Sequence, residues 1–182
     1  MKANDSIEND YSGADLFHLG GMDWQPNKEA AERIIRLFPA ILNSNREAKL
    51  HIIGKGTEQL NTNEASIFLE GFVKDLEQHC ISVGTLVTPI VSGSGVRIKI
   101  LEMMSLGIPV ITTEKGAQGI DYKNNNCLMI ANTDKEIIDA CIEISSNKNL
   151  RKEIGMNAKS YISEHHSFSN ISEKLNKFLG TK

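Results

Sequence analysis

The sequence predicts an α/β fold in which a parallel sheet of about six strands is covered by helices on both faces. Short apolar segments typical of strands alternate with helical patterns along most of the chain. Glycine turns follow most of these strand candidates, and 182 residues is the length of one domain. Strands separated by helices pair in parallel through right-handed crossovers, so helices are expected on both faces of the sheet.

The first half of the chain contains three strand candidates and two helices. A polar stretch, residues 1–14, precedes the first strand candidate, DLFHLGG, which ends in a glycine pair. A helix is expected after Pro26, with Asn27 as its cap and Pro39 as the residue that kinks it or ends it early. Next come the strand candidates AKLHIIGKG and ASIFLEGFV, and then a short helix, KDLEQHCISVG, which stops at a glycine.

The second half contains three more strand candidates and extra C-terminal helices. The buried strand TLVTPIV leads into the segment SGSGVRIKILEMMSLGIPV, residues 92–110, whose helix is expected to end with Gly107 as the C′ residue and Pro109 just beyond. The fifth and sixth strand candidates are PVITT and NCLMIA. Three helical segments follow, DKEIIDACIEISS, KNLRKEIGMNAKSYISEHH and SNISEKLNKFLG.

Composition excludes several classes of function. The net charge is only -3 and no basic run stands out, so a nucleic-acid partner is not expected. Cys80, Cys127 and Cys141 lie singly in apolar segments, which indicates buried free thiols in a reducing compartment. The N-terminus does not resemble a signal peptide, and no apolar run approaches the ~20 residues of a membrane span. We therefore expect a cytoplasmic protein without a transmembrane segment.

The glycine loop at residues 92–97 fits an anion site. Backbone amides at a helix N-terminus lack partners, and the helix dipole adds about half a positive charge there. A plain strand-to-helix turn with small residues is the alternative reading. The spacing is neither that of a P-loop nor that of a dinucleotide fingerprint, and Ser94 does not sit in a nucleophile elbow.

The helix after this loop is apolar around most of its circumference, so we expect it to be buried nearly all round, with a partner for Glu102. Glu102 lies roughly 10 Å along the axis from the loop. A nucleoside whose diphosphate sits at the helix start would bring its ribose hydroxyls there. The alternative partner is Lys99, one turn back, in an internal ion pair. Arg97 and Lys99 could also meet phosphate oxygens.

The stretch GSGVRIKILEMMSLGIPVITT resembles the signature of the C-terminal, nucleotide-sugar-binding half of glycosyltransferase family 4. The segments LFHLGGMDWQPNKEA, LHIIGKG, FLEGFV and VTPIVSGSG resemble that family's successive strand–loop units. The resemblance covers residues 15–182 and implies the B-type glycosyltransferase fold, in which two Rossmann-like domains face a cleft. This chain would be a single donor-binding domain of the Rossmann-like, three-layer α/β/α kind, without the N-terminal acceptor domain.

The resemblance assigns roles along the loop and its helix. Glu102 matches the second of the family's two glutamates, which implies ribose binding. The first glutamate, which usually meets the donor sugar, falls on Ser94, so donor-sugar recognition departs from the family pattern. The amides of Gly95, Val96 and Arg97 fall where the family's backbone meets the diphosphate.

Two further regions match positions with known roles in the family. Lys28 matches a phosphate-binding lysine, while the arginine usually paired with it falls on Gly21, so Arg97 or Lys99 would have to substitute. The EGFV loop, with Phe72 and Val73, matches the region that holds the base. Without the resemblance, Lys28 is a solvated charge and Phe72 is a core residue. His18 and His51, on strand candidates, are read as core or loop residues.

The resemblance implies the donor half of a retaining glycosyltransferase in polysaccharide biosynthesis, which moves a sugar from UDP- or GDP-sugar to a glycan or lipid-linked acceptor. The acceptor domain supplies the usual catalytic histidine, so no catalytic residue is assigned here and the domain is expected to be inactive alone. No D-x-D lies in a suitable loop, and no metal or other cofactor is expected. That missing domain could also meet the inner face of a membrane. Two alternatives remain: a non-enzymatic module that binds a protein partner, and an epimerase-like domain of the same fold.

Overall fold

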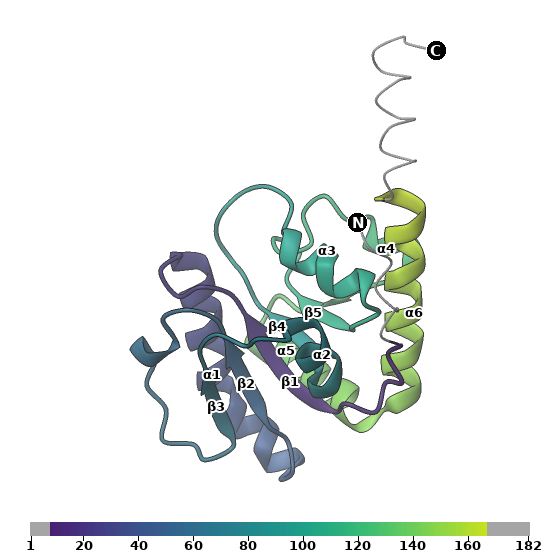
Figure 1. The fold of residues 1–182 in the computed structure, drawn as a ribbon. Helices are drawn as coiled ribbons and strands as arrows, with labels where there is room; N and C mark the ends of the chain where they lie inside the picture. The colour runs from purple at the N-terminus through teal and green to yellow at the C-terminus, as the bar shows by residue number, and fades with distance from the viewer. Residues whose placement is uncertain (1–7, 167–182) are drawn as a thin grey trace, which may run out of the picture.

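A six-stranded parallel sheet forms the middle layer of the structure, a computed structural model that describes residues 8–166 (Figure 1). Its strand order is β3-β2-β1-β4-β5-β6, and every neighbouring pair is parallel. The strands are β1 (Asp15–Leu19), β2 (Leu50–Ile53), β3 (Ile67–Glu70), β4 (Gly84–Thr88), β5 (Val110–Thr112) and β6 (Met129–Ile130). All six strand candidates are confirmed, as is the α/β class.

Helices cover both faces of this sheet, as expected for parallel strands. One face is packed by α1 and α5, and the other by α2 and α3, with α6 contacting both clusters at the end of the chain (Figure 1). The helices are α1 (Gln25–Ser44), α2 (Leu76–Val83), α3 (Ile98–Ser105), α4 (Tyr122–Asn125), α5 (Asp134–Ser146) and α6 (Lys148–His165), with a 3-10 turn, η1 (Thr57–Gln59).

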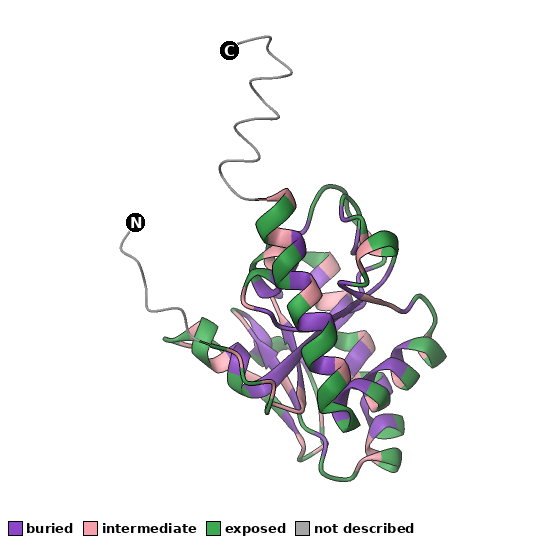
Figure 2. Ribbon diagram, turned by 90° about the vertical axis from the view of Figure 1, so that its right-hand side faces the viewer, coloured by how far each residue is buried: buried purple, intermediate pink, exposed green. Residues whose placement is uncertain are grey.

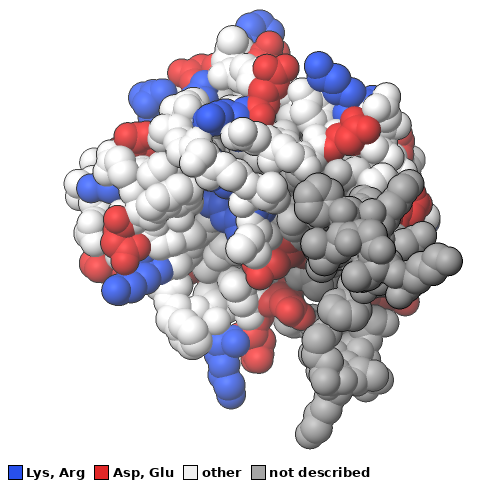
Figure 3. Space-filling view, turned by 90° about the horizontal axis from the view of Figure 1, so that it is seen from above, with Lys and Arg blue, Asp and Glu red and all other residues white. Residues whose placement is uncertain are grey.

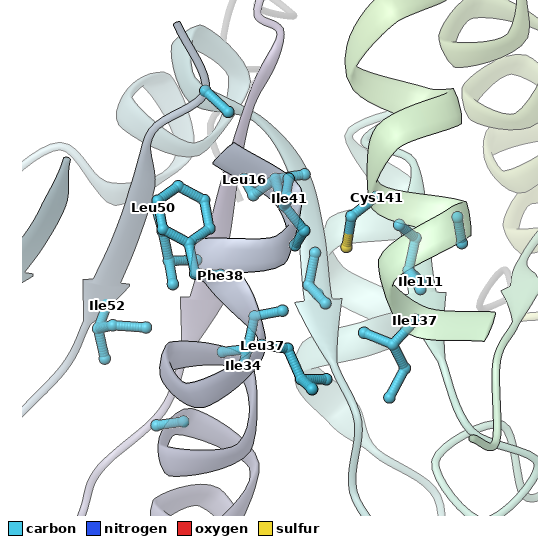
Figure 4. Close-up of a cluster of buried hydrophobic side chains, with 14 of the residues drawn as sticks. Leu16, Ile34, Leu37, Phe38, Ile41, Leu50, Ile52, Ile111, Ile137 and Cys141 are labelled. Carbon is cyan, nitrogen blue, oxygen red and sulfur yellow. The ribbon is translucent and has the colours of Figure 1, made fainter. Parts of the chain in front are cut away.

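Each face of the sheet has its own apolar core. Leu16 and Ile52 on one face meet Ile34, Phe38 and neighbouring side chains of α1, as the close-up shows (Figure 4). On the opposite face, strand residues such as Phe17 pack against α2, α3 and α6. Buried residues accordingly lie on the sheet and on the inward sides of the helices, while exposed residues face outward (Figure 2). The two cores fix the three-layer arrangement.

The strand order reverses direction between β1 and β4. From β1 the chain crosses to β2 on one side, and from β4 it crosses to β5 on the other, so the two central strands are neighbours with Phe17 beside Leu86. The loop after β1 leads to α1 on one face of the sheet, and the loop after β4 leads to α3 on the other. Ligands of open α/β sheets bind at such a switch point.

Close backbone packing at this edge explains the glycines that end the first two strands. The amide of Gly20 donates to the Ile53 carbonyl at 2.9 Å. A Cβ on Gly54, whose φ is +137°, would lie 2.1 Å from the Gly20 carbonyl oxygen. The turns after β1 and β2 can therefore approach each other only because no side chain stands between them.

The structure corrects where α1 begins and ends. The helix begins at Gln25, with Trp24 at the N-cap position, so the expectation of Asn27 as its cap is wrong. Pro39 does not end the helix, which continues to Ser44. Pro39 itself is exposed, and the buried residues on both sides of it hold the last turns on the sheet.

The C-terminal region is described only in part. The first two expected C-terminal helices are α5 and α6, and α5 begins with a capping box formed by Thr133 and Glu136. The third expected helix, SNISEKLNKFLG, lies outside the described residues. None of the described helices combines the length and apolar character needed to cross a membrane.

Truncation of Ile34 to alanine tests the packing of α1 on the sheet. Ile34 is fully buried, so Ile34→Ala should lower the free energy of unfolding by about 2–5 kcal/mol. The same change at Ile98, which is 70% exposed, should change it by less than about 0.5 kcal/mol. Urea denaturation followed by circular dichroism measures both. Equal losses in the two variants would contradict this placement of the core.

Candidate functional site

Two loops meet at the switch point, the one after β1 and the one after β4. The Ser92 hydroxyl donates to Glu29 Oε2 of α1 at 3.3 Å, and the Arg97 guanidinium lies 5.4 Å from the centre of the Trp24 ring. A Cβ on Gly93 would lie 3.4 Å from that ring, so the loop passes close to it. The glycine loop therefore rests on the first turn of α1.

Arg97 shapes the glycine loop from inside. Its side chain is only 6% exposed, and its guanidinium donates to the carbonyls of Ser94 at 2.8 Å and Ser92 at 3.0 Å. Arg97 Nε is buried and has no hydrogen-bond partner in the described part of the chain. Arg97 therefore binds two carbonyls of the loop and places its positive charge beneath it.

The amides of the loop remain available for a ligand. Gly95 is exposed and has φ +87°, a conformation that favours glycine. Within residues 8–166, no hydrogen bond uses the amides of Gly95, Val96 or Arg97. They lead directly into α3, which begins at Ile98 without a side-chain cap. Free amide donors at a helix N-terminus can bind an anionic group.

Lys99 extends back under the two loops. Its ammonium donates to the carbonyl of Leu19, the last residue of β1, at 2.7 Å and to Asn27 Oδ1 of α1 at 2.6 Å. Burial, and secondly the nearby Arg97, lower the pKa of Lys99 to about 7. The alternative in which Lys99 pairs with Glu102 is therefore wrong, because its ammonium is held by β1 and α1 instead.

His18 lies in the same buried polar region and is uncharged at neutral pH. Burial, with the Lys99 charge as a second cause, lowers the pKa of His18 to about 3. His18 Nδ1 lies 3.0 Å from the Val87 carbonyl of β4, a contact in which only a protonated Nδ1 can donate. The expectation of a core histidine is confirmed, since His18 is fully buried.

Glu102 opens onto a groove between α2 and α3. The side chain is exposed, so the expectation of a helix buried nearly all round is wrong. Ile98 and Glu102 are one turn apart on the outward stripe of α3, whereas Ile100 and Met104 face the sheet. The groove measures about 740 Å³ and is lined by Lys74, Asp75, Leu76, Glu77, Gln78, Glu102, Met103, Ser105 and Leu106.

The loop from β3 to α2 forms the outer side of this groove. Phe72 is 92% exposed, which contradicts its reading as a core residue. Val73 is half-buried and packs against the core on the α2 face. The loop is thus anchored by Val73 and presents the Phe72 ring to solvent.

Lys28 and Gly21 lie beside the glycine loop, at the start of α1. Lys28 is half-buried in the first turns of the helix and makes no ion pair among the described residues. The Gly21 carbonyl accepts from Asn27 Nδ2 at 3.2 Å. Lys28 is thus a cation that an incoming anion could engage.

The site residues fall into two groups joined by α3. Lys28, Gly21 and the loop 94–97 lie at the switch point, whereas Glu102 lines the groove, and Phe72 and Val73 directly precede its lining residue Lys74. From above, the molecule shows basic and acidic side chains interspersed, with a basic group in a hollow of uncharged atoms near the centre (Figure 3). The arrangement can hold an elongated ligand with an anion at one end and hydroxyl groups at the other.

Sequence reasoning missed two side chains that organise this site. Trp24 packs against Arg97, and Asn27 accepts from Lys99. Both stand in the segment after the first strand, where the sequence offers only a tryptophan and an asparagine as signals. Neither signal names its partner, because each partner lies more than 70 residues away along the chain.

Comparison with known proteins gives a family match and several fold matches. The family described as glycosyl transferases group 1 matches residues 13–147, more than half of the chain. A curated relative from Klebsiella pneumoniae, named an uncharacterized 44.6 kDa protein in the cps region, is 27% identical over 165 residues. That alignment includes 85% of this chain and 40% of the relative, so the chain spans less than half of the relative's length.

Two solved structures share the fold. A mutant of S. aureus TarM, in complex with fondaparinux, alpha-GlcNAc-glycerol and UDP, matches with a TM-score of 0.76 and 20% identity, over 97% of this chain and 37% of TarM. The C-terminal domain of LpcC, a glycosyl transferase group 1 family protein from Francisella tularensis, matches with a TM-score of 0.65 and 15% identity. The latter match covers 85% of this chain and 86% of that domain.

Replacement of Lys99 by methionine tests its buried ammonium. The folded pKa of about 7 lies below the value of 10.5 for a free lysine, so the unfolded chain binds more protons between these pH values. The Lys99 contribution to stability should therefore rise with pH from about 7 to 10.5 and be constant below about 6.

Urea denaturation of wild type and Lys99→Met across this pH range measures that contribution as a difference curve, in which other titrating groups cancel. Lys152→Met, at an exposed position of α6, is the matched control for the loss of a lysine and should change the free energy of unfolding by less than about 0.5 kcal/mol. A Lys99 difference that is flat above pH 7, or that falls, would show that the ammonium is not buried as described.

Proposed function

Because the chain belongs to the glycosyl transferases of group 1, as a domain of the C-terminal type, we propose that it is the donor-binding half of a retaining glycosyltransferase. Its ligand would be a UDP- or GDP-sugar, and the acceptor a glycan or a lipid-linked saccharide. One observation carries the proposal: α3 combines unpartnered amides at its N-terminus with an exposed carboxylate, Glu102, on the wall of a groove.

The proposed diphosphate site is the start of α3. The amides of Gly95, Val96 and Arg97 donate to its oxygens, and Lys28 approaches from α1. Arg97 and Lys99 add positive charge from below, because the Arg97 terminal nitrogens and the Lys99 ammonium are directed to oxygens of the protein. The proposal requires no metal ion at the diphosphate, because amides and basic side chains supply the counter-charge.

The nucleoside would extend along the groove. A free carboxylate at Glu102 can accept from both ribose hydroxyls, and the loop carrying Phe72 and Val73 would hold the base. The distance from the amides to Glu102, roughly 10 Å along the helix axis, suits the span from a diphosphate to a ribose. Support for this orientation comes from Glu102, which lines the groove and makes no ion pair with another described residue.

Catalysis would consist of positioning the donor and stabilising the departing diphosphate. Ser94 stands where most family members have a glutamate, so the donor sugar would meet a hydroxyl or backbone groups there. The other wall of the cleft and the catalytic histidine would come from an acceptor-binding domain. The exposed apolar side chains of Trp24, Val91, Val96 and Ile98, beside the glycine loop, support a surface for that domain.

The domain would act in polysaccharide biosynthesis on the cytoplasmic side, where nucleotide sugars are made, and the acceptor-binding domain would be the part that meets a membrane. The chain spans 40% of its curated relative and 37% of TarM, so transfer activity is proposed for the complete protein and not for this domain alone.

Glu102→Ala tests the ribose assignment. Loss of two hydrogen bonds to a charged acceptor should weaken UDP or GDP binding by about 1.5–3 kcal/mol, roughly tenfold to a hundredfold in affinity. Titration calorimetry with each nucleotide measures the change. Glu143→Ala, at an exposed position of α5 on the opposite face of the sheet, is the matched control and should bind as wild type does. Equal affinities in wild type and Glu102→Ala would overturn the assignment.

A further inference from the structure

Three metal-ligating side chains gather on the α2 face of the sheet, apart from the groups assigned to the donor. His51 comes from β2 and Glu70 from the end of the neighbouring strand β3, and His79 comes from α2. One nitrogen from each histidine and one oxygen from Glu70 all lie within 4.8 Å of one another. The three side chains are 15%, 25% and 29% exposed, so the cluster is mostly buried but accessible from solvent.

The carboxylate stands between the two imidazoles. Glu70 Oε1 lies 2.5 Å from His51 Nδ1, and Glu70 Oε2 lies 2.8 Å from His79 Nε2. The two rings meet edge to face with their centres 5.9 Å apart. Both carboxylate oxygens and both ring nitrogens thus converge on one small region between β2, β3 and α2.

His79 Nε2 lacks a satisfactory partner in this arrangement. The atom is buried and makes no hydrogen bond within the described chain, although Glu70 Oε2 is only 2.8 Å away. The two atoms are close, but a proton on the ring nitrogen does not point at the oxygen. A buried polar atom without a partner is costly, and an ion placed between the nitrogen and the oxygen would satisfy both lone pairs.

We propose that His51 Nδ1, one oxygen of Glu70 and His79 Nε2 bind a single Zn²⁺ ion. Two imidazoles and a carboxylate suit zinc, whereas magnesium and calcium prefer oxygen ligands alone. Tetrahedral zinc with bonds of about 2.1 Å places its ligand atoms about 3.4 Å apart. The present separations run from 2.5 Å to at most 4.8 Å, so small side-chain rotations would bring the three atoms to that spacing, with water in the fourth position.

The surroundings of His51 are those of a metal ligand. Its other ring nitrogen, Nε2, lies 4.0 Å from Asp15 Oδ2, so a carboxylate stands near the nitrogen that remains when Nδ1 binds zinc. The ring also stacks on Phe68 with centres 5.0 Å apart, which limits its rotation. A carboxylate beyond the histidine and a stacked ring both orient the ligand.

The proposed ion would stabilise the α2 side of the groove. Residues 71–78 lie between Glu70 and His79 in the chain, and this segment contains five of the groove-lining residues, Lys74, Asp75, Leu76, Glu77 and Gln78. An ion that joins Glu70 to His79 and to His51 of β2 closes a short loop at both ends. The role is structural and does not depend on which ligand the groove binds.

Zinc titration of the full chain tests the proposal. Thermal denaturation with added ZnCl₂ should show a rise in melting temperature of about 5 °C or more at a hundredfold excess over Kd, and MgCl₂ should show none. Calorimetry should give one zinc ion per chain. His79→Gln should bind zinc at least about tenfold more weakly, whereas the double variant His165→Gln with His166→Gln, which removes the adjacent histidine pair near the end of α6, should retain that affinity.

Several results would overturn the site: no zinc-dependent rise in melting temperature, wild-type affinity in His79→Gln, or loss of binding in the double variant. If His79→Gln fails to fold, the absorption spectrum of the wild-type chain with Co²⁺ decides the matter. Intense visible bands of tetrahedral cobalt support the site, and weak octahedral bands or no binding exclude it. Nucleotide binding by itself moves none of these readouts, so failure here leaves the donor site to its own test.

Discussion

The ammonium of Lys99 joins the three elements that meet at the switch point. It starts from α3, contacts the last carbonyl of β1 and ends on the Asn27 amide of α1. Chain crossovers diverge at this point, so nothing in the sheet itself holds the two loops together. A buried cation with two oxygen partners does so, and the lowered pKa of Lys99 reflects the energetic cost of its burial. Because Lys99 fixes α3 to β1 and α1, the glycine loop before α3 can remain exposed with unpartnered amides.

The three charged side chains at α3, Arg97, Lys99 and Glu102, have three different roles. Arg97 turns inward and donates to two carbonyls of the loop, while the amides of residues 95–97 have no partner within the described chain. Lys99 secures the helix to the sheet, and Glu102 alone faces the groove. Positive charge thus lies beneath the helix N-terminus and negative charge stands farther along the outward side. This polarity suits a ligand with an anionic end and a hydroxyl-bearing end.

The two walls of the groove are held by different means. On the α3 side, apolar packing and Lys99 anchor the helix to the sheet. On the α2 side, Val73 and the first turn of the helix contribute little burial, and Phe72 is left in solvent. The His51, Glu70 and His79 cluster lies where that weaker wall joins the sheet. A ligand-binding loop is drawn from the less stable part of a fold, so a polar cluster or an ion at its base has a clear physical role.

From the sequence alone, the strand and helix order, the parallel sheet and the resemblance to a donor-binding domain could be predicted, because apolar periodicity and glycine turns are local signals. The local rules failed at Pro39, at the Asn27 cap and in the burial of α3, where tertiary contacts decided the outcome. Sequence spacing could place Lys99 and Glu102 one turn apart. It could not show that the Lys99 ammonium binds the Leu19 carbonyl of β1 and the Asn27 side chain of α1 instead. Likewise His51, Glu70 and His79 are ordinary residues along the chain. Only strand register and helix packing bring them together, because contacts between distant segments depend on the whole fold.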